Sequence, residues 1–305
     1  MKQQLPESVV LLERGWLSSN NVLICGRHGC ALVDSGYATH AGQTLALVEA
    51  ALHGRPLDLL LNTHLHSDHC GGNATLQQRY PALATLIPPG QARFVAPWDA
   101  YALSYRPTGQ ACPPFRYDVL LRPGEEVLLG DKSWQIHAAP GHDPNSVILF
   151  EPQSRLLLSA DALWGNGFGV VFPELDGYDA FAAVADTLDL IESLSPSLVI
   201  PGHGARFSDV ADALARARQR LDSFVADPLK HRRYASKVMI KFKLLDAQSL
   251  SCEALLDWAR ETDLLIRLHS GDPDGDQFAD WIARLVDELA RTGAARRIGQ
   301  QILNQ

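Results

Sequence analysis

The sequence predicts an α/β protein with a mostly helical C-terminal part, and three observations lead to this fold class. Over residues 1–205, short apolar runs alternate with segments of helical periodicity, as expected for a sheet covered by helices. From about Ala205 onward, helical periodicity dominates. The chain has 305 residues, 46% of them hydrophobic, which allows one large domain or two unequal ones. We therefore predict two domains, residues 1–205 and residues 206–305.

The first half begins with strands. The predicted strands, each a short apolar run next to a glycine or a polar turn, are residues 8–12, 21–25, 30–34 and 57–61. Segments with helical spacing are residues 39–53 and a helix through Leu76 to Tyr80. Thr39 is the expected N-cap of the first of these helices.

Residues 88–118 interrupt this alternation with six prolines and several aromatic residues. A long connection of this kind is either a lid or binding loop, or an insertion that serves packing only. The aromatic side chains that we expect to line a substrate pocket come from this segment and from the glycine-rich stretch after residue 162: Trp98, Tyr101, Tyr105, Trp164 and Phe168.

The remainder of the first domain returns to strands. The predicted strands are residues 126–129, 133–138, 146–150, 156–159 and 198–200. One helix is predicted between the last two, over residues 178–194.

The second domain is predicted to be helical with a terminal hairpin. The expected helices are residues 208–226, 231–245, 252–268 and 278–289, and residues 294–303 are expected to form a short hairpin or a strand. Ser251 is the expected cap of the third helix. Asp272 to Asp276 resembles the start of a calcium loop, but Ala283 stands where such a loop needs a glutamate, so a solvated turn is favoured.

The charge pattern bears on partners. The net charge is −8, and residues 1–205 carry nine more acidic than basic side chains. An acidic first domain disfavours nucleic acid as a partner and suits a small-molecule substrate. A basic stripe on one predicted helix could contact RNA but is more often a solvated face; its members are Lys230, Arg233, Lys237 and Lys241.

The chain is expected to be cytoplasmic and to have no membrane-spanning segment. No apolar run approaches the roughly 18 residues that a membrane span requires. The segment Met1 to Glu7 lacks a basic stretch leading into an apolar core, so no signal peptide is expected.

The most informative stretch is Thr63 to Gly72, Thr-His-Leu-His-Ser-Asp-His-Cys-Gly-Gly. His64 and His66 are two residues apart, so in an extended segment they point to the same side. Asp68 and His69 follow where the chain should turn into a helix. Buried imidazoles and carboxylates need partners, and one metal site would satisfy all four side chains. The sequence therefore predicts a metal site.

This stretch resembles the signature T-H-x-H-x-D-H of the metallo-β-lactamase superfamily of hydrolases. Four further residues fall at predicted strand ends, in the order that this family expects: Asp34, His142, Asp161 and His203. The resemblance implies an αββα four-layer sandwich, and the helical tail loosely resembles the winged-helix-like extension of some members. Two departures leave the branch open: Asp143 follows His142 where Thr or Ser is common, and Ala160 precedes Asp161 where Gly is common.

The resemblance also implies a dinuclear metal centre. It assigns His64, His66 and His142 to one cation, it assigns Asp68, His69 and His203 to a second, and Asp161 bridges both. Imidazole and carboxylate ligands suit zinc, with iron or manganese as alternatives. Asp34 is expected to accept the free N–H of a ligand histidine, and Asp68 is also expected to help move protons.

The implied function is hydrolysis by a water that two divalent cations activate. The expected substrate is a small-molecule ester, thioester or lactone, as in the hydroxyacylglutathione hydrolase and lactonase branches. The alternative is a phosphodiesterase or RNase of the same superfamily, supported only by the basic stripe. The oligomeric state is left open, with a homodimer among the possibilities.

The five cysteines are odd in number and include no C-x-x-C pair, which argues against a disulfide framework. Cys70 is the only one next to the metal motif. It is either a packed thiol or a reactive or ligating one, and packing is favoured because the family motif places no ligand there.

Overall fold

The computed structural model describes residues 4–305. Residues 1–3, part of the segment expected not to be a signal peptide, lie outside the described part of the chain. A six-stranded sheet comes first. Its strands, in spatial order, are β1 (Val9–Leu12), β2 (Asn21–Gly26), β3 (Gly29–Val33), β4 (Leu59–Leu61), β5 (Ala84–Ile87) and β6 (Val119–Leu120).

The strand directions in this sheet follow from the lengths of the connections. β1, β2 and β3 pair antiparallel through short turns, whereas β3, β4, β5 and β6 pair parallel. Parallel neighbours need a crossover, and helices supply the first two. These are α1 (Ala41–Leu52) between β3 and β4, and α3 (Asn73–Arg79) between β4 and β5.

A second sheet has five strands in the order β11-β10-β9-β8-β7. Their bounds are β7 (Glu126–Leu129), β8 (Lys132–Ala138), β9 (Val147–Glu151), β10 (Leu156–Ala160) and β11 (Leu198–Pro201). β7 pairs antiparallel with β8, β8 with β9, and β9 with β10. β11 lies parallel to β10, and α6 (Phe181–Leu194) lies between the two in the sequence.

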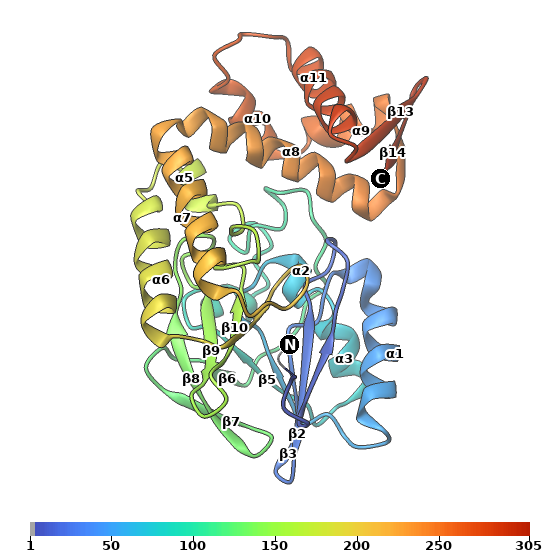
Figure 1. The fold of residues 1–305 in the computed structure, drawn as a ribbon. Helices are drawn as coiled ribbons and strands as arrows, with labels where there is room; N and C mark the ends of the chain where they lie inside the picture. Colours follow the sequence, from blue (N-terminus) through green and yellow to red (C-terminus); the bar gives the residue numbers. More distant parts are fainter. Residues whose placement is uncertain (1–3) are drawn as a thin grey trace. The chain divides into compact units, whose positions relative to one another are not determined.

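Alternation of side chains along the strands builds two apolar layers. Val22 and Ile24 of β2 share one buried cluster with Leu149 and other residues of the second sheet. Leu23, between them, joins a cluster with Val48 of α1 on the opposite face. Figure 1 shows α1 and α3 alongside the first sheet and α6 alongside the second. This is the αββα sandwich that the family resemblance implied.

Short elements connect these layers: η1 (Ala38–His40), α2 (Ser67–Cys70), α4 (Ala92–Val95) and α5 (Phe172–Leu175). The prediction that Thr39 caps α1 is wrong. Thr39 lies inside η1, and His40, at the N-cap position, makes no side-chain cap hydrogen bond. A single 3₁₀ turn runs directly into α1, so this helix begins without a polar cap.

The chain forms two compact units. The first comprises residues up to Leu103 and Ala111–Asp222, and the second comprises Ser104–Gln110 and Ser223–Gln305. Compactness therefore divides the chain after Asp222, within α7 (Val210–Ala226), and the predicted boundary after residue 205 stays a prediction. The proline-rich segment 88–118 contributes to both units. Leu103, Tyr105 and Phe115 are buried, so part of this segment serves packing.

The second unit contains helices and a small sheet. Beyond α7, its elements are α8 (Pro228–Ala247), β12 (Ser249–Ser251), α9 (Cys252–Arg260), α10 (Asp263–Ser270), α11 (Phe278–Arg291), β13 (Ala295–Ile298) and β14 (Gln301–Asn304). The terminal hairpin and the Ser251 cap agree with the prediction, since the Ser251 side chain accepts from the amide of Ala254. The single helix predicted over residues 252–268 is wrong. Thr262 is extended and buried, its hydroxyl donates to the Trp258 carbonyl, and the chain restarts as α10.

The basic stripe of α8 faces partners within the second unit. Arg233 Nε lies 3.1 Å from Glu288 Oε1, and Lys237 Nζ lies 3.3 Å from Glu288 Oε2. Lys241 donates to three acceptors of the C-terminal hairpin region, at 2.6 to 2.7 Å. Among the four residues of the stripe, Lys230 is exposed, and the contacts described include no ion pair or hydrogen bond of its side chain. The stripe thus packs α8 against α11 and the hairpin.

The acidic turn of residues 272–276 is neutralised by an arginine. Arg284 of α11 pairs with Asp272, Asp274 and Asp276, with its closest contact at 2.5 Å. A guanidinium already fills the space between these carboxylates, which agrees with a turn and not with a calcium loop.

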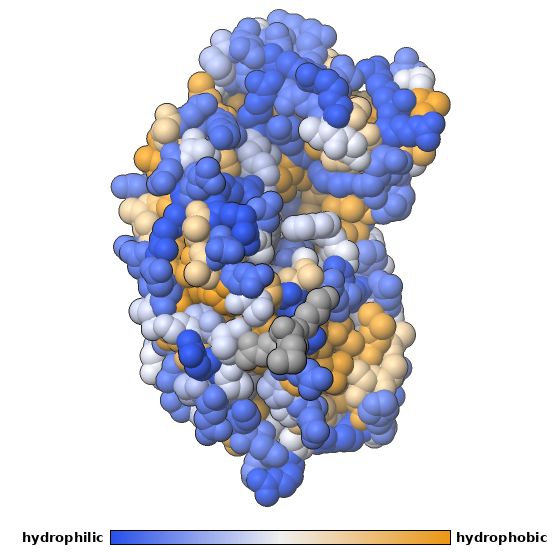
Figure 2. All heavy atoms as spheres, viewed as in Figure 1, coloured by the Kyte–Doolittle hydropathy of each residue, from blue (hydrophilic) through white to orange (hydrophobic). Residues whose placement is uncertain are grey.

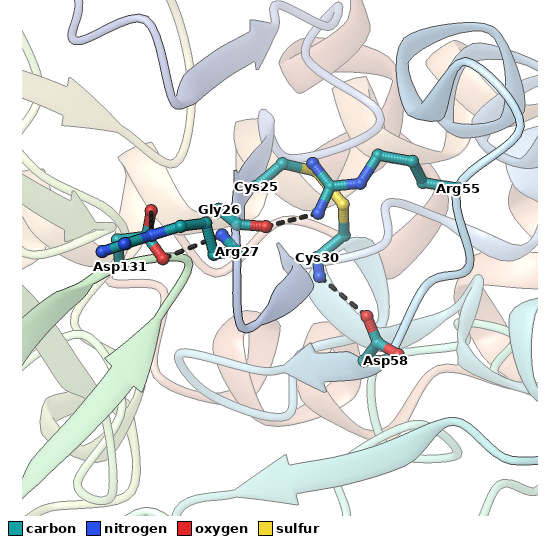
Figure 3. Close-up of a disulfide and its surroundings, with 7 residues drawn as sticks. All are labelled: Cys25, Gly26, Arg27, Cys30, Arg55, Asp58 and Asp131. Atoms are coloured by element: carbon teal, nitrogen blue, oxygen red, sulfur yellow. Dashed lines mark hydrogen bonds and ion pairs between the residues drawn. A yellow bond between two sulfur atoms is a disulfide. The ribbon is translucent and has the colours of Figure 1, made fainter.

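One disulfide joins Cys25 to Cys30 across the β2–β3 hairpin, where the two residues are directly paired (Figure 3). This pair was not predicted, because an odd number of cysteines without a Cys-x-x-Cys motif argues against a disulfide framework. Cys-x₄-Cys spacing around a turn places the two side chains opposite each other on neighbouring strands. Figure 3 also shows the contacts around the bond: the Asp58 carboxylate accepts from the Cys30 amide, and Arg27 pairs with Asp131.

Across residues 4–305, none of the helices combines the length and the apolar character that crossing a bilayer demands. The face of the molecule drawn in Figure 2 is dominated by hydrophilic residues, with apolar atoms in scattered patches.

Candidate metal centre

Strand ends deliver the predicted ligands. β4 stops at Leu61, the chain bends at Thr63 and His64, and His66 is extended again, with φ −67° and ψ 148°, directly before α2. Asp68 and His69 lie in α2. The other three follow the ends of β8, β10 and β11: His142, Asp161 and His203. A side chain beyond a strand end can reach a site without unpairing the ladder.

The structure brings all seven side chains together in two groups. His64, His66 and His142 form the first, and Asp68, His69, Asp161 and His203 form the second. Within each group, one ligand atom per residue lies within 4.8 Å of every other. Asp161 Oδ2 lies 3.4 Å from His142 Nε2 and 3.7 Å from His203 Nε2, so one carboxylate reaches both groups.

In the first group, three ring nitrogens face one another, and a single N–H proton cannot give all of them a hydrogen bond. His66 Nδ1 lies 3.0 Å from His64 Nε2 and 2.8 Å from His142 Nε2. His142 Nδ1 lies 2.6 Å from the Val170 carbonyl oxygen, which can only accept, so Nδ1 carries the proton and Nε2 presents a lone pair. Three imidazole nitrogens that converge in this way fit a cation.

The second group contains a buried nitrogen without a partner. His69 Nδ1 lies 2.8 Å from Asp34 Oδ2, which fixes the ring and leaves Nε2 directed at the cluster. Nε2 is buried, lies 3.5 Å from Asp161 Oδ1, and has no hydrogen-bond partner within residues 4–305. Burial of such an atom is costly unless a cation binds it. The donor set therefore fits the implied metals.

Asp34 connects the ligand helix to β3. Its Oδ1 accepts from the Thr63 amide at 2.9 Å, and its Oδ2 accepts from the Thr63 hydroxyl at 2.9 Å as well as from His69. The residue has φ +59°, in the left-handed region, where aspartate and asparagine are tolerated best among residues with side chains. This conformation turns the carboxylate toward the start of the metal motif.

The electrostatics favour neutral imidazoles in the first group. Burial lowers the pKa of His64 well below its ordinary value, and the neighbouring His69, His66 and His142 lower it further. Burial and the proximity of His142 lower the pKa of His66 to about 3. Neutral imidazole is the form that binds a metal.

The carboxylates dominate the second group. Burial alone would lower the pKa of His69, but the charges of Asp34 and Asp161 raise it well above its ordinary value. Burial alone would raise the pKa of Asp161, but His203 and His69 hold it well below its ordinary value. The Asp161 carboxylate is therefore ionised, the form in which it can bind a metal.

Aromatic rings flank both groups, and two of them were not identified from the sequence. Trp16 stacks on His203 with centroids 5.6 Å apart and is 54% exposed. Phe172 lies 5.1 Å from the His66 ring. A signal for Trp16 existed, because β1 and β2 form a hairpin whose loop lies at the same edge as Asp34.

The five predicted pocket residues lie in different surroundings. Trp164 contacts the centre, since its Nε1 donates to Asp161 Oδ1 at 3.2 Å. Trp98 packs edge-on against Phe115. Tyr101 is 59% exposed, and Tyr105 is buried in the stretch that belongs to the second unit. Phe168 is buried with Arg220 over its ring. A substrate role for these residues stays a prediction.

Comparison with known proteins identifies related chains. The Type A flavoprotein fprA of Rhodobacter capsulatus is 27% identical over 241 residues, covering 72% of this chain and 52% of that protein. A hydroxyacylglutathione hydrolase of Anaeromyxobacter dehalogenans is 32% identical over 194 residues, covering 63% of this chain and 64% of that protein. The chain thus spans about half to just under two thirds of the length of these relatives.

Solved structures with the same fold include a beta-lactamase domain protein from Burkholderia ambifaria. It has a TM-score of 0.62 at 22% identity and covers 99% of this chain and 94% of that one. The protein TTHA1623, solved in a di-iron-bound form, has a TM-score of 0.53 at 27% identity and covers 68% of this chain and 98% of that one. The model of the metallo-beta-lactamase superfamily matches residues 14–203, which include every candidate ligand. The chain belongs to the metallo-β-lactamase superfamily.

Proposed function

We propose that the protein is a dinuclear metal hydrolase that cleaves a small-molecule ester, thioester or lactone. One observation carries the proposal: two ligand groups share the Asp161 carboxylate, whose Oδ2 lies 3.4 Å from one group and 3.7 Å from a member of the other. Seven ligands for two cations leave coordination positions for water and substrate, which is typical of catalytic sites. When bound, two divalent cations lower the pKa of a water and polarise the substrate carbonyl.

The residues of the chain divide the remaining work. His64, His66 and His142 would hold one cation, Asp68, His69 and His203 would hold the other, and the Asp161 carboxylate would serve both. Asp68 and His66 are the most exposed of the set, with side chains 15% exposed. Asp68 Oδ2 lies 3.1 Å from His203 Nε2. The other carboxylate oxygen of Asp68 can pass a proton to the leaving group.

The aromatic surroundings support an uncharged, partly apolar substrate. Trp16 and Trp164 border the site on the His203 side, and Phe172 borders it on the side of His66. Apolar walls with few polar groups orient a small molecule and exclude water. One relative is named a hydroxyacylglutathione hydrolase, and an acylglutathione is a thioester. Thioesters are therefore the first substrates to assay.

Zinc is the proposed metal at both positions, because imidazole and carboxylate ligands suit it. Iron is the main competitor, since TTHA1623 was solved in a di-iron-bound form. Elemental analysis of protein purified without added metal decides between them. Two zinc ions per chain support the proposal, and a predominance of iron overturns this part of it.

A substrate panel tests the reaction class. Metal-loaded protein is assayed with thioesters, esters, lactones, β-lactams and phosphodiesters. We expect turnover of at least one carbonyl substrate. Phosphodiester cleavage without carbonyl hydrolysis would instead support the nuclease alternative, against which the internal pairing of Arg233, Lys237 and Lys241 argues.

Two variants test the ligand assignment. His66→Ala and Asp161→Asn should each reduce kcat/KM by on the order of 10³-fold or more, with circular dichroism unchanged. The matched control is Asp186→Asn, an exposed aspartate on α6, which should keep full activity. Undiminished turnover in either ligand variant contradicts the two-metal mechanism.

A further inference from the structure

Two thiols lie side by side next to the ligand helix. Cys70 Sγ and Cys112 Sγ are 3.7 Å apart, although 42 residues separate them in the sequence. Cys70 is the last residue of α2, directly after His69, and is fully buried. Cys112 is partly exposed and lies in the stretch 110–118, which has no helix or strand. The proposed hydrolysis uses neither thiol.

We propose that Cys70 and Cys112 are an oxidisable dithiol that closes to a disulfide when the protein meets a peroxide. The sulfur–sulfur bond is about 2.05 Å long, so the two atoms need to approach by less than 2 Å. The irregular backbone around Cys112 can supply this movement. The amide of Ala111 donates to the Tyr37 hydroxyl at 3.1 Å, which attaches this part of the segment to the residue that precedes η1 within the first unit.

Loss of the Cys70 S–H does little damage to α2. The thiol donates to the carbonyl oxygens of Leu65 and His66, at 3.5 Å and 3.2 Å. The His66 carbonyl also accepts from the amides of His69 and Cys70, at 3.0 Å and 3.2 Å. These backbone hydrogen bonds remain after oxidation, so the first turn of the ligand helix persists.

The chemistry balances with hydrogen peroxide as the oxidant. The sulfur of the partly exposed Cys112 attacks a peroxide oxygen, becomes a sulfenic acid, and releases one water. The Cys70 sulfur then attacks Cys112 Sγ, the S–S bond forms, and the sulfenic oxygen leaves as a second water. Two thiols have lost two hydrogens and two electrons, and the peroxide has been reduced to two waters. A small dithiol reductant reverses the step.

The bond would link residues 111–118 covalently to the helix that carries Asp68 and His69. It would remove none of the candidate metal ligands. The prolines at 113 and 114 would then be held against the ligand helix, and the proline-rich segment would be anchored at its C-terminal part. The pair is therefore a modification site beside the metal centre.

Thiol counting in denaturant tests the proposal without any assay of catalysis. Because Cys25 and Cys30 already form a disulfide, the protein should show three reactive thiols before peroxide treatment and one afterwards. Peptide mass mapping should find Cys70 linked to Cys112, and dithiothreitol should return both of these cysteines to thiols in the same map. The Cys252→Ser control should fall from two thiols to none.

The variant Cys112→Ser separates pairing from general oxidation. It retains Cys70 and Cys252 as thiols, and both should survive the same peroxide dose. Cys70 is buried, and without Cys112 no sulfenic acid forms beside it for its sulfur to attack. Three surviving thiols in the parent protein, a Cys112 sulfinic acid beside an unmodified Cys70, or a Cys112-linked dimer on a non-reducing gel would each overturn the proposal.

Discussion

At the residue scale, Asp34 shows how a single side chain can fix a ligand without binding metal. It accepts three hydrogen bonds, two from Thr63 and one from His69, and its backbone has φ +59°. The hydrogen bond to His69 Nδ1 determines which ring nitrogen carries the proton. Such partners of a ligand histidine typically change metal affinity by about 10- to 100-fold when they are removed.

We predict that Asp34→Asn lowers metal affinity by about 10- to 100-fold while the protein remains folded. Asparagine tolerates positive φ and has nearly the same shape as aspartate. The change therefore removes only the negative charge and one acceptor oxygen. Competition with a chromophoric chelator measures the affinity, and thermal unfolding of the metal-free protein serves as the folding control. Equal affinity in both proteins would show that Asp34 supports only the backbone of Thr63.

Gly202, between β11 and His203, is a second residue whose role is geometric. A Cβ atom built there would lie 2.2 Å from Asp161 Oδ1 and 3.0 Å from His69 Cε1. Hydrogen bonds fix the backbone on both sides, since the Gly202 amide donates to Ala160 and the Gly202 carbonyl accepts from Asn20, both at 2.7 Å. A side chain would therefore displace the Asp161 carboxylate, which is the proposed bridge.

We predict that Gly202→Ala weakens binding of the metal pair by about 10-fold or more, because the new methyl group would push the proposed ligands Asp161 and His69 out of position. The matched control is Gly42→Ala in α1, where nothing lies within 4 Å of the new Cβ. That change should leave affinity unaltered and raise stability by about 0.5–1 kcal/mol. Isothermal titration and urea unfolding measure the two effects. Equal metal affinity in both variants would contradict the role given to Gly202.

At the element scale, a carboxylate organises the turn between β9 and β10. Glu151 ends β9 and is 1% exposed. Its carboxylate accepts from Lys132 Nζ at 2.8 Å and from the amides of Gln153 and Ser154 at 2.9 Å each. Burial alone would raise the pKa of Glu151, but these hydrogen bonds, with the Ser154 hydroxyl, lower it to about 2.

This shift predicts an acid-sensitive contribution to stability. The folded pKa lies below the ordinary value of 4.5, so the stabilisation is fully present above pH 4.5 and is lost as the pH falls toward 2. Glu151→Gln should therefore cost about 1–3 kcal/mol at pH 7, and the difference from the parent should shrink by pH 3. Urea unfolding of metal-free protein at both pH values measures it. The exposed Glu125→Gln should show little effect at either pH, and a constant gap for Glu151→Gln would refute the linkage.

The same scale shows what the sequence could predict. Strands such as 30–34 and 156–159 were recognisable because apolar runs ending at a glycine or a polar residue have few alternatives, and the ligand positions follow from those ends. The break at Thr262 was not recognisable, because apolar periodicity continues through it and the interruption depends on burial and a hydrogen bond to Trp258. Trp16 is a different case: the predicted strands 8–12 and 21–25 already place its loop at the edge of Asp34, but its stacking on His203 joins residues 187 positions apart and has no local signal.

At the scale of the whole molecule, each compact unit has its own apolar core and its own polar connections. The candidate ligands all belong to the first unit. In the second unit, Lys241 of α8 connects the helix to the terminal hairpin, because its ammonium group donates to Ala294, Asn304 and Gln305. A cation bound to the first unit stabilises that unit directly, whereas the lysine acts only on the second.

We therefore predict that metal removal and Lys241→Met affect different parts of the chain. Chelation should increase hydrogen exchange in peptides covering residues 59–70 while residues 295–304 keep their protection. Lys241→Met leaves three acceptors without their donor, which should cost the second unit about 1–3 kcal/mol and expose residues 295–304 to exchange. Lys230→Met, on the same helix with an exposed side chain, is the control and should change neither region. If either perturbation opens both regions to the same extent, the two units unfold as one, and the division after Asp222 describes only the packing of the chain and not its cooperativity.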